Sequence, residues 1–326
     1  MMTSSFNVAA KAKLHWPEIS SDPALIMHRE NAVFRVETAK GLAALRIHRP
    51  HYHSHSEISA ELSWMAYLAK AGMEVPAPFP NSKGELLSVI NDEHGQNFVV
   101  DLLSWVNGQP LGRSNVPLAY SETEVQTIFT DVGQNLAQLH NLSDAWDKPQ
   151  DFHRHALDKQ GFLGETAAWG KFWEASVLSQ SEMKLMYDVR QLAAAQLDTL
   201  VNQGADYGLI HADLVRENIF VDGGKIRFID FDDAGFGFRM FDLAVALIKN
   251  REEPHYEVLK AALFYGYKAQ RNISATDEQS LDLFLALRDF AYLGWADARR
   301  YEPGMAPRIE KIKQNTLLAA QKFLNV

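Results

Sequence analysis

The sequence contains no cysteine among its 326 residues, which excludes disulfides, thiolate chemistry and cysteine metal sites. Long apolar runs are also missing. The longest, FVVDLL and LAVALI, are far shorter than the roughly 20 residues that a membrane-spanning helix needs. The first residues, MMTSSFNVAAKAKLHW, lack the apolar core and small-residue cleavage site of an export signal. We therefore expect a cytoplasmic protein that does not bind a membrane.

Positive charge is in short supply. The chain has 32 lysines and arginines against 41 acidic residues, which gives a net charge of -9. Binding to nucleic acid requires clustered Lys and Arg that displace counterions, so we expect no nucleic-acid partner. A cationic small substrate suits this charge balance better than a polyanion does. The length fits two domains or one domain with two lobes.

The first third of the chain is rich in strand patterns. Apolar and polar residues alternate on either side of AKG in AVFRVETAKGLAALRIHRP, which predicts two antiparallel strands joined by a tight turn. Ser54 and Glu57 form a capping box that opens a helix ending at Gly72. The segment GQNFVVDLLSWV predicts a buried strand that ends near Ser104. We therefore expect an N-terminal lobe over residues 1–104.

Helical patterns dominate residues 105–326. A second capping box, Ser121 to Glu124, opens a segment whose apolar residues fall on one face of a helix. These residues are Val125, Ile128, Phe129, Val132, Leu136 and Leu139. Further helical patterns cover residues 181–201, 255–270 and 278–301. The expected fold class is α+β, with a strand-rich lobe followed by a larger, mainly helical lobe.

The stretch LIHADLVRENIFVDGGKIRFIDFDD, residues 209–233, places acidic side chains beside two runs typical of buried strands. Buried carboxylates are costly unless they are paired or bound to a metal. The DGG sequence predicts a tight hairpin that brings Asp213, Asn218 and Asp230 to one end. Asn218 and Asp230 supply oxygen ligands that suit Mg²⁺, and Asp213 is left to accept a proton from a hydroxyl. The alternative is a purely structural loop, in which Asp213 caps a turn and Asn218 starts a strand.

This pattern, H-x-D-x-x-x-x-N followed by a hairpin and I-D-F, resembles the aminoglycoside phosphotransferase and choline kinase family, homoserine kinase-like enzymes included. Further similarity lies in RENAVFRVET, AALRIHRP, LLSWVNGQPL, LAQLH and FDLAVAL, so it covers most of the chain. The resemblance implies a two-lobed protein-kinase-like fold, whose small antiparallel-sheet lobe has one main helix. It also implies ATP-dependent phosphorylation of a hydroxyl, with Asp213 as the catalytic base and Asn218 and Asp230 as the magnesium ligands.

The resemblance extends to the nucleotide site. The family commonly has lysine on the third strand of the small lobe, where this chain has Arg46, whose fork suits a pair of phosphate oxygens. Glu61 on the following helix is its expected partner, with Glu57 one turn earlier as the alternative. The small lobe lacks a GxGxxG motif, so the phosphates would meet backbone amides near Glu30 and Asn31. The other expected nucleotide contacts are Leu103, Ser104 and Trp105 at the connector.

Several other residues have two interpretations. Asp242 matches a family aspartate that steadies the catalytic loop, although an ordinary acid at a helix N-terminus explains it almost as well. His211 and His140 match structural positions, and Ala212 stands where the family often has glycine. The segment HRPHYHSHSE suggests a transition-metal site, but no acidic or cysteine partner completes a known spacing. Its histidines are His48, His51, His53 and His55.

The acceptor site is expected from residues in the catalytic and metal loops and on the late helix. The candidates are Arg216, Asp232, Arg288, Tyr292, Trp295 and Asp297. Acids and aromatic rings favour a cationic amine, whereas the two arginines favour a carboxylate. The expected acceptors are therefore amino alcohols and hydroxy amino acids such as homoserine, choline, ethanolamine and hydroxylysine. The alternatives are a stress-response-type protein Ser/Thr kinase of the same fold and a nucleotide-binding pseudokinase.

Overall fold

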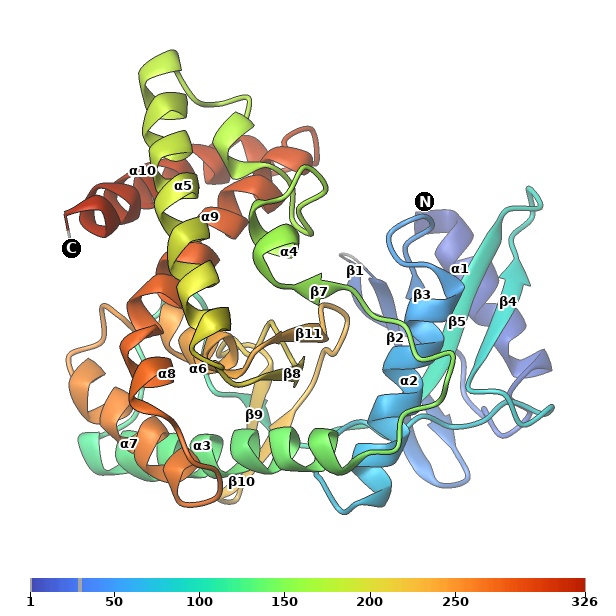
Figure 1. The fold of residues 1–326 in the computed structure, drawn as a ribbon. Helices are drawn as coiled ribbons and strands as arrows, with labels where there is room; N and C mark the ends of the chain where they lie inside the picture. Colours follow the sequence, from blue (N-terminus) through green and yellow to red (C-terminus); the bar gives the residue numbers. More distant parts are fainter. Residues whose placement is uncertain (1, 29–30, 326) are drawn as a thin grey trace. The chain divides into compact units, whose positions relative to one another are not determined.

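A computed structural model describes residues 2–28 and 31–325. Glu30, which we expected near the nucleotide phosphates, lies outside these described residues. The chain forms two compact units, each assembled from separate stretches of sequence (Figure 1). The sheet unit holds residues 1–109, 145–154 and 219–232, and the helical unit holds residues 110–144, 155–218 and 233–326. Residues 105–109, 145–154 and 219–232, which the sequence assigned to the helical lobe, therefore fall in the sheet unit.

Five antiparallel strands in the order β1-β2-β3-β5-β4 form the main sheet. They are β1 (Ala24–His28), β2 (Asn31–Thr38), β3 (Gly41–His48), β4 (Leu87–Asn91) and β5 (Asn97–Ser104). β2 and β3 pair along their whole length, from Asn31 opposite His48 to Thr38 opposite Gly41. This register confirms the predicted hairpin. The strand predicted to end near Ser104 is β5.

Residues along these strands alternate between the two faces of the sheet. Phe34, Leu45 and Leu102 are fully buried on one face, in a cluster that includes Trp16 and residues of helix α1 (Met2–Lys11). A 3₁₀ turn, η1 (Ala12–Leu14), follows α1. The sequence did not predict α1. The opposite face of β3 and β5 carries charged side chains, among them Arg46 and Asp101, which are adjacent in register.

Helix α2 (His55–Lys70) begins with the predicted capping box. The Ser54 hydroxyl accepts the backbone N–H of Glu57 at 3.2 Å, and the Glu57 carboxylate accepts the Ser54 N–H at 2.8 Å. Just beyond its C-cap, Gly72 has φ 88°, a left-handed conformation that glycine adopts without strain. Glu61 is fully buried on this helix, which directs its carboxylate into the unit.

The predicted DGG hairpin consists of β9 (Ile219–Asp222) and β10 (Lys225–Phe228), with the short β6 (Gln109–Pro110) beside β9. Gly223 and Gly224 have φ 55° and 85°, the positive values that a two-residue hairpin turn requires. Ile219 pairs with Phe228, so the hairpin returns the chain to the end at which it entered. The Glu74 carboxylate accepts Lys225 Nζ and Arg227 Nε, each at 2.8 Å, which fixes the hairpin within the sheet unit.

The helical unit contains eight helices among its described residues. They are α3 (Glu122–Ala145), α4 (Lys159–Leu163), α5 (Gln180–Asn202), α6 (Arg239–Ile248), α7 (Tyr256–Lys268), α8 (Ala275–Gln279), α9 (Leu281–Ala298) and α10 (Met305–Leu324). A 3₁₀ turn, η2 (Phe172–Glu174), precedes α5. A small sheet in the order β7-β11-β8 joins β7 (Ala156–Leu157), β11 (Gly235–Phe238) and β8 (Tyr207–Ile210). The Ser121 capping box to Glu124 is confirmed at the start of α3.

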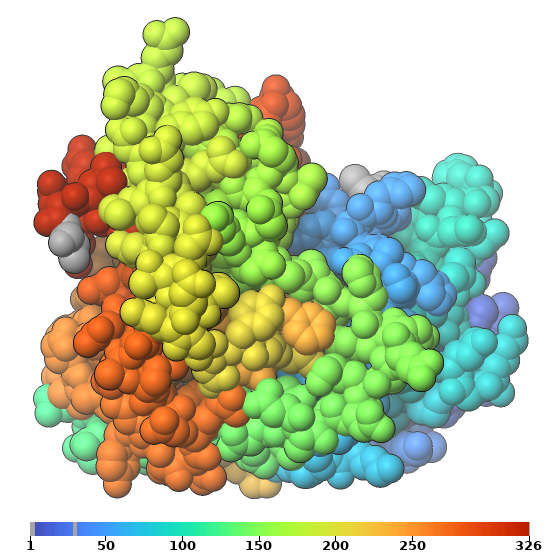
Figure 2. Space-filling view, in the orientation of Figure 1, coloured from blue at the N-terminus to red at the C-terminus, as the bar shows by residue number. Residues whose placement is uncertain are grey.

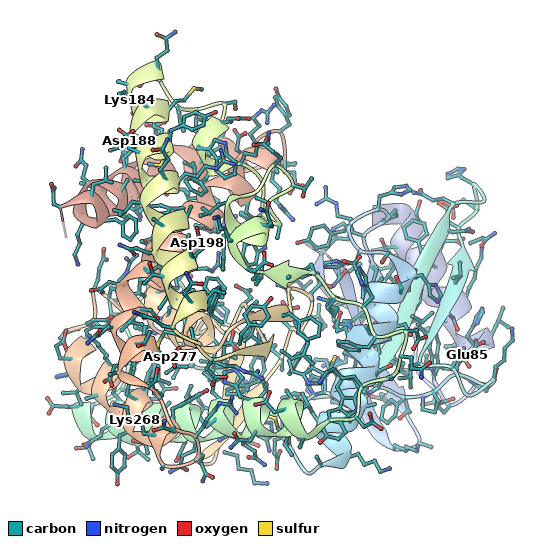
Figure 3. All side chains as sticks on the ribbon, in the orientation of Figure 1. Glu85, Lys184, Asp188, Asp198, Lys268 and Asp277 are labelled. Atoms are coloured by element: carbon teal, nitrogen blue, oxygen red, sulfur yellow. The ribbon has the colours of Figure 1, made fainter. Side chains whose placement is uncertain are left out.

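Helix α6 is the centre of this unit, because every one of its residues is buried. It packs against α9, and α10 packs on α9 and α5 (Figure 1). The outer side of α5 forms the yellow ridge in Figure 2. Lys184, Asp188 and Asp198 lie along this helix (Figure 3). In residues 2–28 and 31–325, no helix has the length and apolar character needed to span a membrane.

Candidate active site

A short loop after β8 positions Asp213, the predicted base. Ala212 has φ 67°, a left-handed conformation that glycine adopts without strain. Asp242 of α6 holds the loop, because its carboxylate accepts the backbone N–H of His211 at 2.8 Å and that of Ala212 at 2.7 Å. Asp242 thus makes the steadying contact that the family resemblance implied.

The support behind this loop is a buried polar cluster. Burial raises the pKa of Asp242 to about 6, although the two backbone donors and Arg239 favour its charged form. His140 Nε2 lies 3.1 Å from the Asp242 carboxylate, and its Nδ1 lies 2.7 Å from the Tyr267 hydroxyl. Burial lowers the pKa of His140 well below its usual range, so this histidine is a neutral structural group.

The Asp213 carboxylate is held at both oxygens. Asn218 Nδ2 donates to Oδ2 at 3.1 Å and also to the Asp213 carbonyl at 2.8 Å. Arg288 of α9 donates to Oδ1 at 2.7 Å. Partial burial, with a smaller effect from Asp233, raises the pKa of Asp213 to about 7, while Arg288 opposes that rise. The side chain is 24% exposed, so an acceptor hydroxyl has access to a fixed and moderately basic carboxylate.

The two predicted metal ligands flank the β9–β10 hairpin. Asn218 directly precedes β9, and its Nδ2 is engaged by Asp213, which leaves Oδ1 as a ligand atom. Asp230 follows β10 by two residues and has φ 67°. A left-handed aspartate costs roughly 1 kcal/mol, and such strain is common at functional sites. Both residues offer the hard oxygen donors that Mg²⁺ prefers.

The four histidines of HRPHYHSHSE do not form a metal site. Across the residues that the structure describes, no group of three or more His, Asp or Glu side chains is placed to hold a metal ion. His48 instead contacts Asp101 at 2.6 Å, and His53 lies 3.6 Å from Asp232. His51 and His55 are exposed. These contacts give the transition-metal interpretation no support.

Arg46 lies in the sheet unit, is only 6% exposed, and is paired with two carboxylates. Its Nη1 donates to Glu61 at 2.9 Å, whereas Glu57 is occupied by the α2 capping box. Its Nε and Nη2 form a bidentate pair with Asp101, at 3.0 and 2.9 Å. Glu61 is thus the partner on α2, as the sequence suggested.

Asp101 is the member of this cluster that the sequence did not reveal. Burial alone would raise the pKa of Asp101, but the charges of Arg46 and His48 hold it below its usual range. A planar guanidinium can bridge a bidentate carboxylate on a neighbouring strand and a second carboxylate on a helix, whereas a lysine ammonium lacks this fork. Asp101 therefore gives a physical reason for arginine at position 46.

Asp232 belongs to the sheet unit together with Asn31, a predicted nucleotide contact. Asn31 Nδ2 donates to the Asp232 carboxylate at 3.2 Å. Burial would raise the pKa of Asp232, but the contact with His53 and the charges of His53, His48 and Arg46 lower it far below its usual range. Asp232 is therefore an ionised member of the Arg46 cluster, and these contacts give it no role in recognising an acceptor.

The connector residues have backbone partners of their own. Ser104 Oγ accepts the Ala77 N–H at 2.8 Å, and Ser104 N donates to the Ala77 carbonyl at 2.8 Å. Trp105 N donates to the Leu42 carbonyl at 3.2 Å, and Leu103 is 4% exposed. These contacts fix the course of the connector. Direct nucleotide contact by these residues stays a prediction.

Arg216 lies in the helical unit and is 1% exposed. Its Nη2 donates to the Lys249 carbonyl at 2.7 Å and to Glu253 at 2.8 Å. Its Nη1 donates to the Val116 carbonyl at 2.8 Å. The guanidinium therefore ties the catalytic loop to the rest of the unit, and it is not available for an acceptor.

The remaining acceptor candidates lie on α9. The Asp297 carboxylate accepts the backbone N–H and the hydroxyl of Ser176, at 3.0 and 2.6 Å, which gives it a structural role. Trp295 stacks on Tyr292 with ring centroids 5.3 Å apart. Arg288 bonds to Asp213, and its guanidinium lies 5.6 Å from the Tyr292 ring. Of this set, Arg288 contacts the predicted base directly, and Tyr292 lies next to Arg288.

Comparison with known proteins agrees with this geometry. A model of the phosphotransferase enzyme family matches residues 25–283, most of the chain. The chain belongs to the phosphotransferase enzyme family. Among its relatives, homoserine kinase from Sinorhizobium medicae (strain WSM419) is 26% identical over 269 residues, which are 80% of this chain and 74% of that protein. Amicoumacin kinase from Bacillus subtilis (strain 168) is 25% identical over 241 residues, covering 74% of this chain and 66% of that protein.

Solved structures also match this phosphotransferase over nearly its whole length. The microcompartment-associated aminopropanol kinase has a TM-score of 0.82 and 28% identity, with 98% of this chain and 97% of that chain covered. Together with the antiparallel sheet and the mainly helical unit, this likeness confirms the expected protein-kinase-like α+β fold class. The family match confirms the expected phosphotransferase activity.

The sequence did not single out one residue of the phosphotransferase that acts electrostatically on Asp213. Lys249, the first residue after α6, places its Nζ 4.4 Å from the Tyr292 ring centroid. Burial, with a further effect from Arg288, lowers the pKa of Lys249. The sequence carried one usable signal, a lone lysine directly after an apolar helix that follows the metal loop.

Proposed function

We propose that this phosphotransferase moves the γ-phosphoryl group of ATP to a hydroxyl of a small amino alcohol or hydroxy amino acid. The acceptor oxygen bonds to the γ-phosphorus, the bond from that phosphorus to the bridging oxygen breaks, and ADP leaves. Asp213 takes the proton of the hydroxyl. The observation that carries this proposal is the Asp213 carboxylate, which Asn218 and Arg288 fix at both oxygens.

Asn218 and Asp230 are the proposed magnesium ligands. Their amide and carboxylate oxygens are the hard donors that this ion takes in small numbers beside substrate phosphates. The hairpin register supports the pairing, since Ile219 and Phe228 lie opposite each other next to these two positions. When bound, Mg²⁺ neutralises charge on the phosphates. A cytoplasmic location, with access to ATP, belongs to the same proposal.

The acceptor class is supported by the relatives, which include a homoserine kinase and an aminopropanol kinase. Both names denote short molecules with a hydroxyl and an amine. The test is ATP consumption with pooled amino alcohols and hydroxy amino acids, followed by a search for acceptors that gain the mass of one phosphoryl group. Asp213→Asn is the matched control, because it changes the base and keeps the shape of the side chain.

Other outcomes of this screen would point elsewhere. Phosphorylation of a generic protein substrate, with no small acceptor modified, would favour the stress-response-type protein kinase. Tight nucleotide binding with no turnover on any acceptor would favour the pseudokinase. Either result would overturn the proposed function.

A further inference from the structure

The strongest unused feature lies beside Asp213 in the helical unit. Lys249 is half-buried, and its ammonium lies 4.4 Å from the Tyr292 ring centroid. Among the described residues, this ammonium makes no hydrogen bond and no ion pair. An ammonium has three donors, and its removal from water is unfavourable unless an anion or acceptor replaces that water. Lys249 therefore has unused donors next to the predicted base.

A second cation converges on the same ring. The Arg288 guanidinium lies 5.6 Å from the Tyr292 ring and 5.8 Å from the Trp169 ring. One of its terminal nitrogens bonds to Asp213, while its Nε is buried without a hydrogen-bond partner. Arg308 donates to the Tyr292 hydroxyl at 3.2 Å. Positive charges that converge on one ring repel each other, and a bound anion relieves that repulsion.

The nearby acids already have partners of their own. Asp289 forms an ion pair with Arg251 at 2.8 Å, and Glu217 accepts the backbone N–H of Ser114. Asp213 is held by Arg288 and Asn218. These acids favour the charged form of Lys249 from a distance, but none contacts its ammonium. Arg288 therefore has Asp213 as its counterion, whereas Lys249 has no counterion in contact within the described part of the chain.

We propose that Lys249 and Arg288 together bind a carboxylate of the acceptor, with Tyr292 and Trp169 as the apolar wall. The acceptor is then a short hydroxy acid or hydroxy amino acid, and not a simple amino alcohol. Arg288 contacts Asp213 directly, so a carboxylate on Arg288 places a hydroxyl a few atoms away beside the base. This inference rests on the proposed function, in which Asp213 receives that proton.

The test uses acceptor pairs that differ only by a carboxylate. Homoserine is compared with 3-amino-1-propanol, and threonine with 1-amino-2-propanol, in the full-length protein with MgATP. We expect the carboxylate-bearing member of at least one pair to have the higher kcat/KM. Glycerol 3-phosphate is a further arm, because a phosphate group on the acceptor offers the same charge. A preference for glycerol 3-phosphate would show that the site binds a phosphate and not a carboxylate, and it would overturn the proposal.

Variants of Lys249 give the second readout. Lys249→Gln should raise KM for the preferred acid by about 10- to 100-fold, the usual worth of a lost charged hydrogen bond, and change kcat little. Lys249→Arg should recover part of the loss, because it restores the charge. Lys184→Gln, on the exposed face of α5 (Figure 3), should behave like the parent.

The outcomes separate this inference from the function on which it rests. Turnover of amino alcohols alone, with Lys249→Gln unchanged, would overturn the carboxylate site and leave the kinase intact. If no small acceptor turns over, calorimetry with homoserine still measures carboxylate binding. A lack of binding there, or equal binding to the parent and to Lys249→Gln, would overturn the site as well.

Discussion

Two cations, the buried Arg46 in the sheet unit and the half-buried Lys249 in the helical unit, have opposite surroundings. Arg46 in the sheet unit donates three hydrogen bonds to Glu61 and Asp101, both fully buried. Lys249 in the helical unit has the face of Tyr292 and, within the described part of the chain, no hydrogen-bond partner. A buried ion pair holds its geometry without help, whereas an unpaired buried charge lowers stability until a counterion arrives.

The difference distinguishes charges that hold the fold together from charges that are free to bind a ligand. Arg46, Glu61 and Asp101 complete one another, so the sheet unit holds these charges in place before any ligand binds. In the helical unit Arg288 is paired with Asp213, whereas Lys249 has no hydrogen-bonded partner among the described residues, so the proposed acceptor carboxylate would supply its counterion. Replacing a framework charge should reduce stability, and replacing a binding charge should reduce turnover or affinity.

The largest effect on turnover is expected at Asp213, which contacts Arg288 in the helical unit. Asp213→Asn should lower kcat by roughly 10² to 10⁴, because the amide cannot accept the hydroxyl proton. The affinity for MgATP should change little, which equilibrium binding of the nucleotide measures. A variant that turns over as fast as the parent would show that another group is the base.

Arg46 should give the largest effect on stability. Arg46→Met leaves Glu61 without its hydrogen-bonded counterion and Asp101 with His48 alone, so we expect a loss of about 3 to 5 kcal/mol in the free energy of unfolding, measured by urea denaturation. Arg35→Met, at an exposed position on the neighbouring strand, is the matched control. Unchanged stability with lost ATP affinity would instead make Arg46 primarily a phosphate ligand.

Asp230 tests the proposed metal site. Asp230→Ala removes one of the two proposed ligands, and turnover should fall on the order of 10²-fold, the usual loss when a charge-stabilising group is removed. Calorimetry with and without magnesium measures nucleotide binding by this variant. We expect that binding to lose most of its dependence on the ion. An unchanged magnesium requirement would remove Asp230 from the ligand set.

Local sequence patterns predicted local structure well. The capping boxes at Ser54 and Ser121 and the turn at Gly223 involve residues within a few positions of each other, and all three are confirmed. Propensity and side-chain geometry act over that range. The partner of Arg46 on α2 could also be predicted, because Glu61 follows only 15 positions later on the next element.

Contacts between residues that are far apart in the sequence could not be predicted. Asp101 meets Arg46 only because β5 pairs with β3 in one register, 55 positions along the chain. Lys249 meets Tyr292 only because α9 packs on the C-terminal end of α6. The structural partners of Arg216 and Asp297, which are Glu253 and Ser176, could not be predicted for the same reason, since they come from other segments. A charge in a sequence does not reveal whether folding gives it an internal partner.

The smallest expected effect is the one that separates the two cations most directly. Lys249→Gln should raise the free energy of unfolding by roughly 0.5 to 1 kcal/mol, since it removes an unpaired charge at a binding surface, the kind of site where stability and function conflict. The folded pKa of Lys249 lies below its unfolded value of about 10.4, so the unfolded chain binds the proton more tightly. At pH values below the folded pKa, the charge of Lys249 therefore lowers the free energy of unfolding by its full amount. It disappears as pH rises toward about 10.4, and the advantage of Lys249→Gln should shrink over the same window.

Thermal unfolding of the parent, Lys249→Gln and the surface control Lys184→Gln measures this difference. Arg288, Asp213, Glu217 and Asp289 face Lys249 in all three proteins. The charge of Lys249 lowers the pKa of Asp213, which is about 7, so the comparison is made at a pH well above that value, where Asp213 is ionised in every variant. Added homoserine should raise the Tm of the parent more than that of Lys249→Gln, because at a given concentration a ligand that binds more tightly stabilises the fold more. A loss of stability in Lys249→Gln would contradict this account, because it would show that the ammonium already has a stabilising partner in the folded protein.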